Sequence, residues 1–360
     1  MRLPAVIVLA AALTSCAVPG IRTFNNDLAK SYHDPVGYFH RVAGAGDLVA
    51  VMRCVEEGFV GVNARDAYGW TACMYAARGG HDGVVEYLVA KGADFKAAEA
   101  GETALTIAID GGWPGTAAYV IEAGGAVTSR DPDGNSPLMK AAVRGYGDIV
   151  RELLSRGFDI NEKNNAGKTP LLAAIEARYF DIAGILLKKG ADPDARDASG
   201  AAPLLVAIEN NYSDIFGLLL AARADTNVRD AQARPALVAA MDFGRPDLAV
   251  RLVRAGADPG RADAGGRTAL HCAVLAGNDE LARLLVEKGA GLNARDRDGM
   301  TPLMIAAYYG RDDMVRLLVE RGADTALKNN AGMSAAMLAR ESRFEAVAAF
   351  LDSRVSGGGR

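Results

Sequence analysis

The chain has 360 residues, of which 50% are hydrophobic, so it can bury a large core. Its 40 lysine and arginine residues nearly balance 44 aspartate and glutamate residues. The sequence has no run of five or six like charges, so its charge pattern does not indicate a nucleic-acid partner. Four cysteines at scattered positions are too few for a disulfide framework.

The first residues have the pattern of an export signal. Met1-Arg2 supplies a short positively charged start, and residues 3–13 form an apolar stretch of the length expected in a signal peptide. A helix that crosses a bilayer needs about 20 apolar residues, so this stretch is too short to span a membrane. The sequence therefore predicts a signal peptide over residues 1–15.

The segment Leu13-Thr14-Ser15-Cys16 comes next, with one aliphatic residue, two small residues and a cysteine. It resembles the lipobox of bacterial lipoproteins. In that family the cysteine thiol is joined to diacylglycerol, the chain is cut just before it, and the new amino terminus is usually acylated. The resemblance therefore implies lipid attachment at Cys16, and several acyl chains at about 0.8 kcal/mol per buried CH₂ would make the anchor persistent. An ordinary cleaved signal with a chance cysteine, or a misassigned start codon, stays open.

Ala17 bears on where such an anchor lies. An aspartate after the lipidated cysteine often signals inner-membrane retention in enteric bacteria, and this chain has alanine there. The resemblance thus implies a lipid-anchored protein of the cell envelope on the periplasmic side of the outer membrane, with the leaflet left open. Residues 16–36 lack sustained periodicity, and we expect a flexible tether that reaches about 25 Å from the anchor.

The rest of the chain repeats itself with an almost constant period. A leucine recurs every 33 residues at Leu105, Leu138, Leu171, Leu204, Leu237, Leu270 and Leu303, and Cys73 takes the same position 32 residues before the first. Around this position the chain repeats Asp-x-x-Gly-x-Thr-Pro-Leu, as in residues 296–303, and Gly-Ala-Asp follows, as in residues 322–324. Such a regular period predicts a solenoid of short units.

Each copy encodes two helices and a turn. Thr301 can cap the first helix, and Pro302 suits the first helical position. Residues 303–307 and 315–319 place apolar side chains at i, i+3 and i+4 on two successive helices. Gly322 stands where the second helix ends and a left-handed residue is commonly required. The next Asp-x-x-Gly supplies the turn of a short β-hairpin.

The period and the Thr-Pro-Leu-His-x-Ala phrase resemble the ankyrin repeat. The resemblance implies an all-α repeat solenoid of helix-turn-helix units joined by β-hairpin loops. We count about ten units over residues 37–355, with cap units at 37–63 and 329–355 because terminal repeats must face water on one side. Residues 356–360 are expected to be a disordered tail.

Some units depart from the pattern. The sixth and seventh units have Arg223 and Ala233 in place of glycine, and the seventh has Pro235-Ala236 in place of Thr-Pro, so we expect local looseness there. The histidine of the phrase is kept only in His271. In ankyrin repeats that histidine ties neighbouring hairpins by hydrogen bonds, so its loss elsewhere implies more reliance on apolar packing.

Patterns for catalysis or metal binding do not emerge from the sequence. Gly167-Lys168-Thr169 resembles the end of a phosphate-binding loop, but Glu162 stands in place of the upstream glycine. We therefore assign this segment to the hairpin and helix cap of the fifth unit. His81 and His271 lie about six units apart, which excludes a shared metal site. We expect a protein that is not an enzyme, with no cofactor, no metal and no small-molecule substrate.

Three cysteines, Cys54, Cys73 and Cys272, fall on apolar helical positions. This placement predicts buried structural thiols. A redox role for any of the three stays open.

Ankyrin-type proteins bind partners through their hairpin tips and the exposed edge of each first helix, which together line a concave groove. Carried onto this sequence, the rule gives Tyr68, Trp70, Arg78, Asp133, Arg144, Lys168, Glu209, Asp242, Phe243, Arg267, Arg297, Tyr308 and Tyr309 as partner-binding residues. Aromatic residues and arginine are frequent at interface hot spots, so we expect Tyr68, Trp70, Phe243, Tyr308 and Tyr309 to be anchors. The alternative is that tip residues vary freely because nothing packs on them.

These observations together predict a protein–protein interaction scaffold of the bacterial cell envelope. The expected partner is a protein, and the membrane is contacted only through the N-terminal lipid. Two other functions stay open. One is an envelope stress factor that protects an antioxidant enzyme, and the other is a secreted effector that acts on host proteins, although the lipobox argues for retention.

Overall fold

The computed structural model describes residues 34–99, 101–125 and 129–355. The predicted signal peptide, Cys16, most of the tether and the tail at 356–360 lie outside the described residues. Within the described ranges, no helix has the length and apolar character needed to cross a membrane. The chain divides into two compact units, Met1–Lys189 and Gly190–Arg360.

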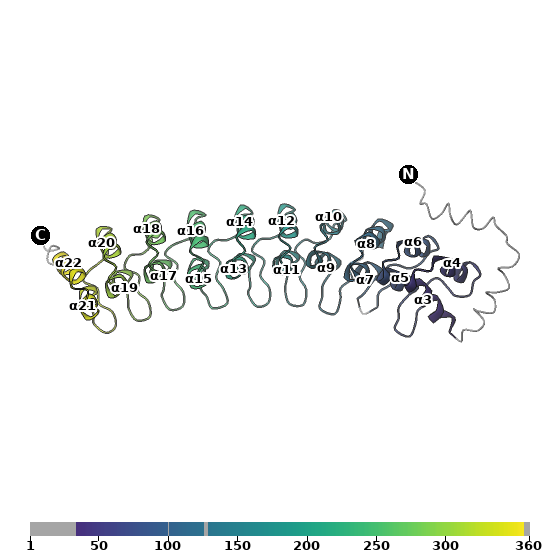
Figure 1. Ribbon diagram of the computed structural model, residues 1–360, viewed down its shortest axis with the longest axis horizontal. Coiled ribbons are helices and arrows are strands. Elements are labelled where there is room, and N and C mark those ends of the chain that lie inside the picture. Colours follow the sequence, from purple (N-terminus) through teal and green to yellow (C-terminus); the bar gives the residue numbers. More distant parts are fainter. Residues whose placement is uncertain (1–33, 100, 126–128, 356–360) are drawn as a thin grey trace. The chain divides into compact units, whose positions relative to one another are not determined.

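Five helix pairs make up the described part of each unit (Figure 1). The first unit contains α3 (Pro35–Ala45), α4 (Leu48–Glu56), α5 (Ala72–Gly79), α6 (Asp82–Ala90), α7 (Ala104–Gly111), α8 (Pro114–Val120), α9 (Pro137–Arg144), α10 (Gly147–Ser155), α11 (Pro170–Glu176) and α12 (Phe180–Lys188). The second contains α13 (Pro203–Glu209), α14 (Ser213–Ala221), α15 (Ala236–Asp242), α16 (Pro246–Arg254), α17 (Ala269–Ala276), α18 (Asp279–Glu287), α19 (Pro302–Tyr308), α20 (Asp312–Glu320), α21 (Ala335–Glu341) and α22 (Glu345–Val355). A π-helical turn, Ile121–Gly125, follows α8.

Within each unit the first helices of the pairs form one layer and the second helices form another (Figure 1). Helix α7 contacts α5 and α9 in the first unit, and α17 contacts α15 and α19 in the second. The loops that join successive pairs extend beyond the layer of first helices. The hairpins form isolated antiparallel bridges in the described residues, such as Lys328 with Ser334, instead of full strands. The predicted all-α solenoid of about ten helix-turn-helix units is confirmed.

Buried hydroxyl groups decide where most of the first helices begin. The Thr169 side chain accepts a hydrogen bond from the Leu172 N–H at 3.3 Å, and Thr301 accepts one from the Met304 N–H at 3.3 Å. Both threonines are almost completely buried. Because the first N–H groups of a helix have no partner within it, a buried cap residue fixes the start of the helix.

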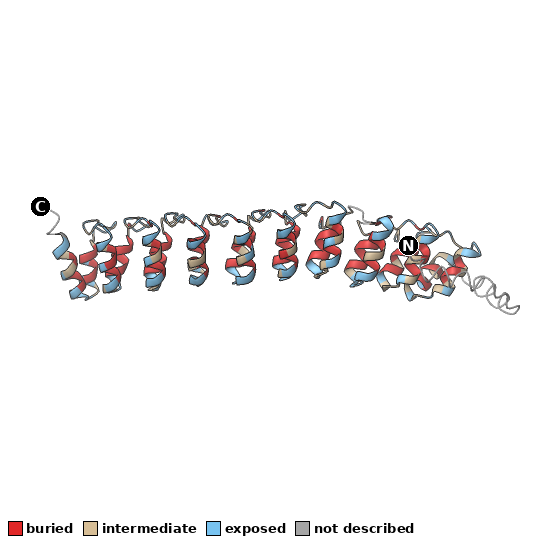
Figure 2. Ribbon diagram, turned by 90° about the horizontal axis from the view of Figure 1, so that it is seen from above, coloured by how far each residue is buried: buried red, intermediate tan, exposed pale blue. Residues whose placement is uncertain are grey.

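The core of each unit comes from the repeating leucine and its alanine neighbours. Leu138 and Leu270 are fully buried, as are the small residues Ala306 and Ala307 in the first helix α19. Small side chains let neighbouring helices pack closely. Figure 2 shows buried residues along the helices and mostly exposed residues along the loops. Each helix pair therefore completes its core against the next pair.

The predicted burial of the three cysteines is confirmed. Cys54, Cys73 and Cys272 are buried and free of disulfide bonds. Burial raises the pKa of the Cys73 thiol to about 12 and that of Cys272 to about 11. Since the thiolate is the reactive form, these cysteines pack as small apolar side chains at neutral pH.

Two buried histidines tie neighbouring repeats. His271 Nδ1 accepts a hydrogen bond from the Thr268 N–H at 3.1 Å, so the proton is on Nε2, which donates to the Met300 carbonyl oxygen at 3.1 Å. His40 takes the equivalent place in the first pair, with Nε2 3.0 Å from the Ala64 carbonyl oxygen. The sequence pointed only to His271, because the first unit lacks the Thr-Pro-Leu phrase.

The irregular repeats in the second unit contain several unfavourable positions. Arg223 and Ala233 have left-handed backbones with φ of 63° and 60°, where other copies have glycine. This conformation costs roughly 1–2 kcal/mol for a residue with a Cβ atom. Ala202 and Pro235 are N-cap residues without a side-chain hydrogen bond to the helix. The local looseness that the sequence indicated in these two repeats stays a prediction, and these positions give it a physical reason.

Restoring the missing groups should stabilise the chain. We expect Ala202→Thr to raise the free energy of unfolding by about 1 kcal/mol, because it supplies the hydroxyl cap found in other repeats. We expect Ala233→Gly to raise it by about 0.5–1 kcal/mol by removing the left-handed strain. Urea unfolding followed by circular dichroism measures both. Ala202→Val, with no hydroxyl, and Ala231→Gly, in the same turn, are matched controls, and equal gains from these controls would refute the explanation.

Stability should also depend on the protonation of the buried histidines. Burial lowers the pKa of His40 and His271 below the ordinary value of 6.5. The unfolded chain then binds more protons than the folded chain below pH 6.5, so the free energy of unfolding falls as the pH falls through that value. We expect His271→Gln to flatten this fall in urea titrations taken at successive pH values. A slope equal to that of the unmodified chain would contradict the assignment.

Candidate functional site

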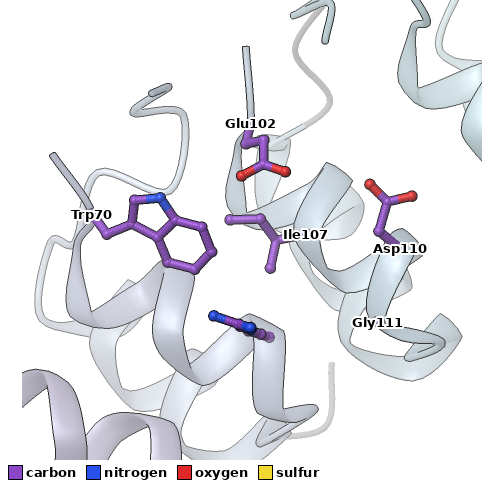
Figure 3. Close-up of a pocket in the computed structure, with 6 residues that line it drawn as sticks. Trp70, Glu102, Ile107, Asp110 and Gly111 are labelled. Atoms are coloured by element: carbon purple, nitrogen blue, oxygen red, sulfur yellow. The ribbon is translucent and has the colours of Figure 1, made fainter. Parts of the chain in front are cut away.

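An open pocket lies between the second and third repeats of the first unit (Figure 3). Its volume is about 350 Å³. The lining residues come from two hairpin tips and two first helices, and they are Trp70, Arg78, Glu102, Ile107, Asp110 and Gly111. Trp70 precedes the N-cap of α5, and Ile107 lies in the neighbouring helix α7. The pocket thus brings together the two predicted residues Trp70 and Arg78.

Hydrogen bonds to Asp66 order the hairpin around Trp70 and the ring that packs on it. The Asp66 carboxylate accepts the backbone N–H of Trp70 at 2.9 Å and the Tyr75 hydroxyl at 2.7 Å. Burial opposes ionisation of Asp66, but the hydrogen bonds it accepts outweigh this and lower its pKa. The Tyr75 ring then packs on the Trp70 ring at 5.2 Å between centroids. Trp70 is consequently held in place beside the pocket.

Arg78 lies over the face of the Trp70 ring, with its guanidinium carbon 5.7 Å from the ring centroid. This is a cation–π arrangement. Arg78 is exposed, and no salt bridge joins it to another residue of the described chain. Tyr68, at the tip of the same hairpin, is 78% exposed. The second repeat therefore offers two aromatic rings and an available positive charge to a partner.

Two of the predicted charged residues farther along the first unit are already paired. Arg144 lies 3.3 Å from Asp110, and Lys168 lies 2.6 Å from Glu176. Lys140, almost fully buried, bridges Asp110 at 2.5 Å and Asp131 at 3.2 Å. The predicted residues Arg144 and Lys168 thus satisfy acidic groups of the chain itself. Lys140 was not predicted, although a lysine two residues after the repeating leucine is a signal that the sequence contained.

The second unit contains a similar network. Arg267 binds Asp242 at 3.0 Å and Asp263 at 2.9 Å. Arg234 binds Asp230 at 2.7 Å and Asp242 at 3.3 Å, and its guanidinium carbon lies 5.1 Å from the centroid of the Phe243 ring. The predicted residues Asp242, Phe243 and Arg267 are therefore joined through Arg234. Partly exposed ion pairs contribute little to stability, but they leave little free charge on this surface.

A hollow of about 250 Å³ lies beside this network. Glu209, Arg234 and Phe243 line it together with Ser199 and Gln232 from two hairpin tips. Glu209 is exposed and has no salt bridge to a residue of the described chain. The second unit thus has a hollow built in the same way as the pocket of the first unit, from hairpin tips and first helices.

The remaining predicted residues lie at the surface. Tyr308 and Tyr309 are 43% and 49% exposed, and their rings form an edge-to-face pair with centroids 5.2 Å apart. Asp133 and Arg297 are exposed at hairpin tips, where their backbone carbonyls accept hydrogen bonds from the next loop. No group of three or more histidine, cysteine, aspartate or glutamate residues in the described ranges has the geometry of a metal site.

A row of residues at the start of the second helices was missed. The Trp113 ring covers Gly80, where a Cβ atom would lie 2.2 Å from it, and Trp113 Nε1 donates to the Arg78 carbonyl oxygen at 2.9 Å. His81 makes the same contact with the Gly44 carbonyl oxygen at 2.9 Å. Trp113 therefore fixes the end of α5 that carries Arg78. The sequence signal that could have found them is a second set of aromatic residues that recurs with the same period as the leucines.

Comparison with known proteins agrees with this geometry. The family described as ankyrin repeats in three copies matches residues 33–99, 95–164, 156–230 and 236–329. The chain belongs to the ankyrin repeat family. The crystal structure of the ankyrin repeat domain of Bcl-3, a member of the IkappaB family, is similar, with a TM-score of 0.52 and 29% identity over 60% of this chain and 98% of that one. Ankyrin repeats form protein-interaction domains, and this chain has such a domain.

Two curated relatives match shorter stretches. The human NAD-capped RNA hydrolase NUDT12 is 37% identical over 79 residues, which is 22% of this chain and 17% of the hydrolase. The E3 ubiquitin-protein ligase Ufd4 of Drosophila melanogaster is 33% identical over 114 residues, which is 31% of this chain and 4% of the ligase. The chain therefore spans less than a fifth of either protein, and their activities belong to them.

Proposed function

We propose that the chain is a protein-binding scaffold that a lipid on Cys16 holds in the bacterial cell envelope. The pocket of the first unit carries the binding part of this proposal. The Trp70 ring, which packs on Tyr75, and an arginine without a salt bridge stand beside the apolar side chain of Ile107. Tryptophan and arginine at the centre of a surface pocket are typical anchors of protein interfaces.

The paired charges of the other repeats support the same assignment. Arg144, Lys168 and Arg267 already bind carboxylates of the chain, so a partner gains little by approaching them with charged groups. Aromatic and apolar side chains then provide the affinity, and the ion pairs around them provide a polar rim.

The envelope part of the proposal is supported by the sequence. Residues 3–13 and the segment that ends in Cys16 follow the order of a lipoprotein signal, and they precede the tether and the repeats. A scaffold on such an anchor would work beside the membrane, within reach of proteins in the periplasm.

Removing the aromatic anchors should abolish binding without unfolding the chain. We expect a variant with Trp70→Ala, Tyr308→Ala and Tyr309→Ala to lose capture of its partner in living cells, because hot-spot residues dominate interface energy. Crosslinking, affinity purification and identification of the captured protein measure this. Thermal unfolding should change little, since Tyr308 and Tyr309 are exposed and Trp70 is only partly buried.

Val49→Ala and Phe59→Ala are suitable controls, because these exposed apolar residues lie in the first repeat, away from the pocket. They should leave capture unchanged. Persistent capture by the triple variant would show that the assigned surface is wrong.

Replacement of Cys16 tests the anchor separately. We expect Cys16→Ser to move most of the protein from the membrane fraction to the soluble fraction, because serine has no thiol for the lipid. Immunoblotting of the two fractions measures the change. A Cys54→Ser variant should stay in the membrane fraction, and a Cys16→Ser protein that also stays there would refute the lipid anchor.

A further inference from the structure

The two pockets show which positions of each repeat line a shared surface. Both are lined by residues that lie three positions before the repeating leucine, two positions after it and five positions after it. Trp70, Ile107 and Arg78 are examples in the first unit, and Arg234, Val206 and Glu209 are examples in the second. We call these three sets of positions the lining columns.

The lining columns change character in the last three repeats of the second unit. Six of the nine positions there are apolar or aromatic and hold Leu275, Met300, Ile305, Tyr308, Met333 and Leu338, and the other three hold Arg267, Cys272 and Glu341. Leu275 is 45% exposed and Tyr308 is 43% exposed, Met300 and Met333 are half-buried, and Ile305 and Leu338 are buried. Exposed apolar side chains gathered on one surface mark interaction sites. We call these six residues the apolar strip.

The apolar strip has the features of a protein-binding surface to which no partner is bound. Helix α19 contacts both α17 and α21, so neighbouring members of each column lie on adjacent helices. Methionine side chains adapt their shape to different apolar partners. The hydroxyls of Tyr308 and the adjacent Tyr309 make no hydrogen bond within the described chain, so they are available to the backbone of a bound peptide.

The charges in these columns indicate which partner fits. Arg267 is neutralised by Asp263 and Asp242. Glu341, exposed at the end of α21, has no salt bridge in the described chain. The hairpin tip next to Met300 carries Arg297 and Asp298, whose charges cancel. Glu341 is therefore the one uncompensated ion of the lining columns in these three repeats.

We propose that the apolar strip binds an apolar segment of a partner polypeptide that carries lysine or arginine at one end, opposite Glu341. This inference rests on the proposed function and names the class of partner segment. Apolar side chains of the segment cover Leu275, Met300 and Tyr308, and its cation pairs with the Glu341 carboxylate. A segment with an aspartate or glutamate at that end is disfavoured, because like charges would meet without compensation.

Selection of random peptides displayed on phage, with the full chain immobilised, tests the inference. We expect enriched peptides to combine aliphatic or aromatic residues with a lysine or arginine and to contain few acidic residues. Tyr308→Ala with Leu275→Ala should weaken the enriched peptide at least about tenfold in fluorescence anisotropy, which corresponds to about 1.4 kcal/mol. Leu218→Ala, which makes the same change as Leu275→Ala at an exposed leucine of α14 outside the columns, should have no effect.

The charge is tested on the same peptides. Glu341→Gln should remove the preference for lysine or arginine, and Glu341→Lys should reverse it toward acidic residues. Glu345→Gln, at an exposed glutamate of α22, is the matched control and should leave the preference intact. Enrichment of acidic peptides by the unmodified chain, or a preference that survives Glu341→Lys, would overturn the inference.

Other occupants give different results. Binding to phosphatidylcholine vesicles that Tyr308→Ala abolishes would assign the apolar strip to lipid. Dimerisation in sedimentation velocity that Tyr308→Ala abolishes would assign it to a second copy of the chain. Either result overturns the inference. If Trp70→Ala alone abolishes partner capture in cells while no peptide binds the apolar strip, the proposed function stands and this inference falls.

Discussion

Everything in this fold depends on the fact that no helix pair can bury its apolar side chains alone. A pair of short helices has an apolar stripe on each helix and too little area between them to exclude water, so the stripe must be covered by the next pair. The fully buried leucines Leu138 and Leu270 and the alanines beside them meet this condition. The constant period follows, because a shift of one residue would turn the stripe away from its neighbour.

The same condition shapes the surface. Hairpin tips and the last turn of each first helix are not needed to cover a neighbour, so they are free to carry polar or aromatic residues. Contacts between adjacent repeats nevertheless use many of them, as the bond from Arg267 to Asp242 and the bond from Lys140 to Asp110 show. What is left for a partner is the set of side chains without such bonds, including Trp70, Arg78 and Tyr308.

The sequence predicted the fold well because local signals agree with the packing. The leucine period, the Thr-Pro start of the first helices and the glycines at helix ends each indicate the same element at the same place. His40 was missed for a physical reason: the first unit has a different cap sequence, and only the contact with the Ala64 carbonyl reveals its equivalence to His271.

The surface was predicted less completely, because pairing depends on distances between repeats. Nothing in the sequence fixes the distance from Arg144 to Asp110 or from Arg267 to Asp242, since each pair joins residues of different repeats. The rule for hairpin tips therefore named surface positions without separating charges that are paired within the chain from charges that are available to a partner. Trp113 was overlooked because it lies outside the positions of the rule, yet it holds the carbonyl of Arg78.

In the irregular repeats of the second unit, a residue with a strained backbone directly precedes a residue that lines the surface hollow. Ala233 has a left-handed backbone, and the next residue, Arg234, holds Asp230 and Asp242 and lies over Phe243. The path of the backbone through this turn is set by the surrounding hydrogen bonds, such as the one from the Arg234 backbone N–H to the Asp230 carboxylate at 2.8 Å. A glycine in place of Ala233 would therefore relieve the strain without moving the turn. Strain of this kind persists where neighbouring contacts determine the conformation. In this repeat the contacts that determine the backbone conformation also position Arg234 beside the hollow lined by Glu209 and Phe243.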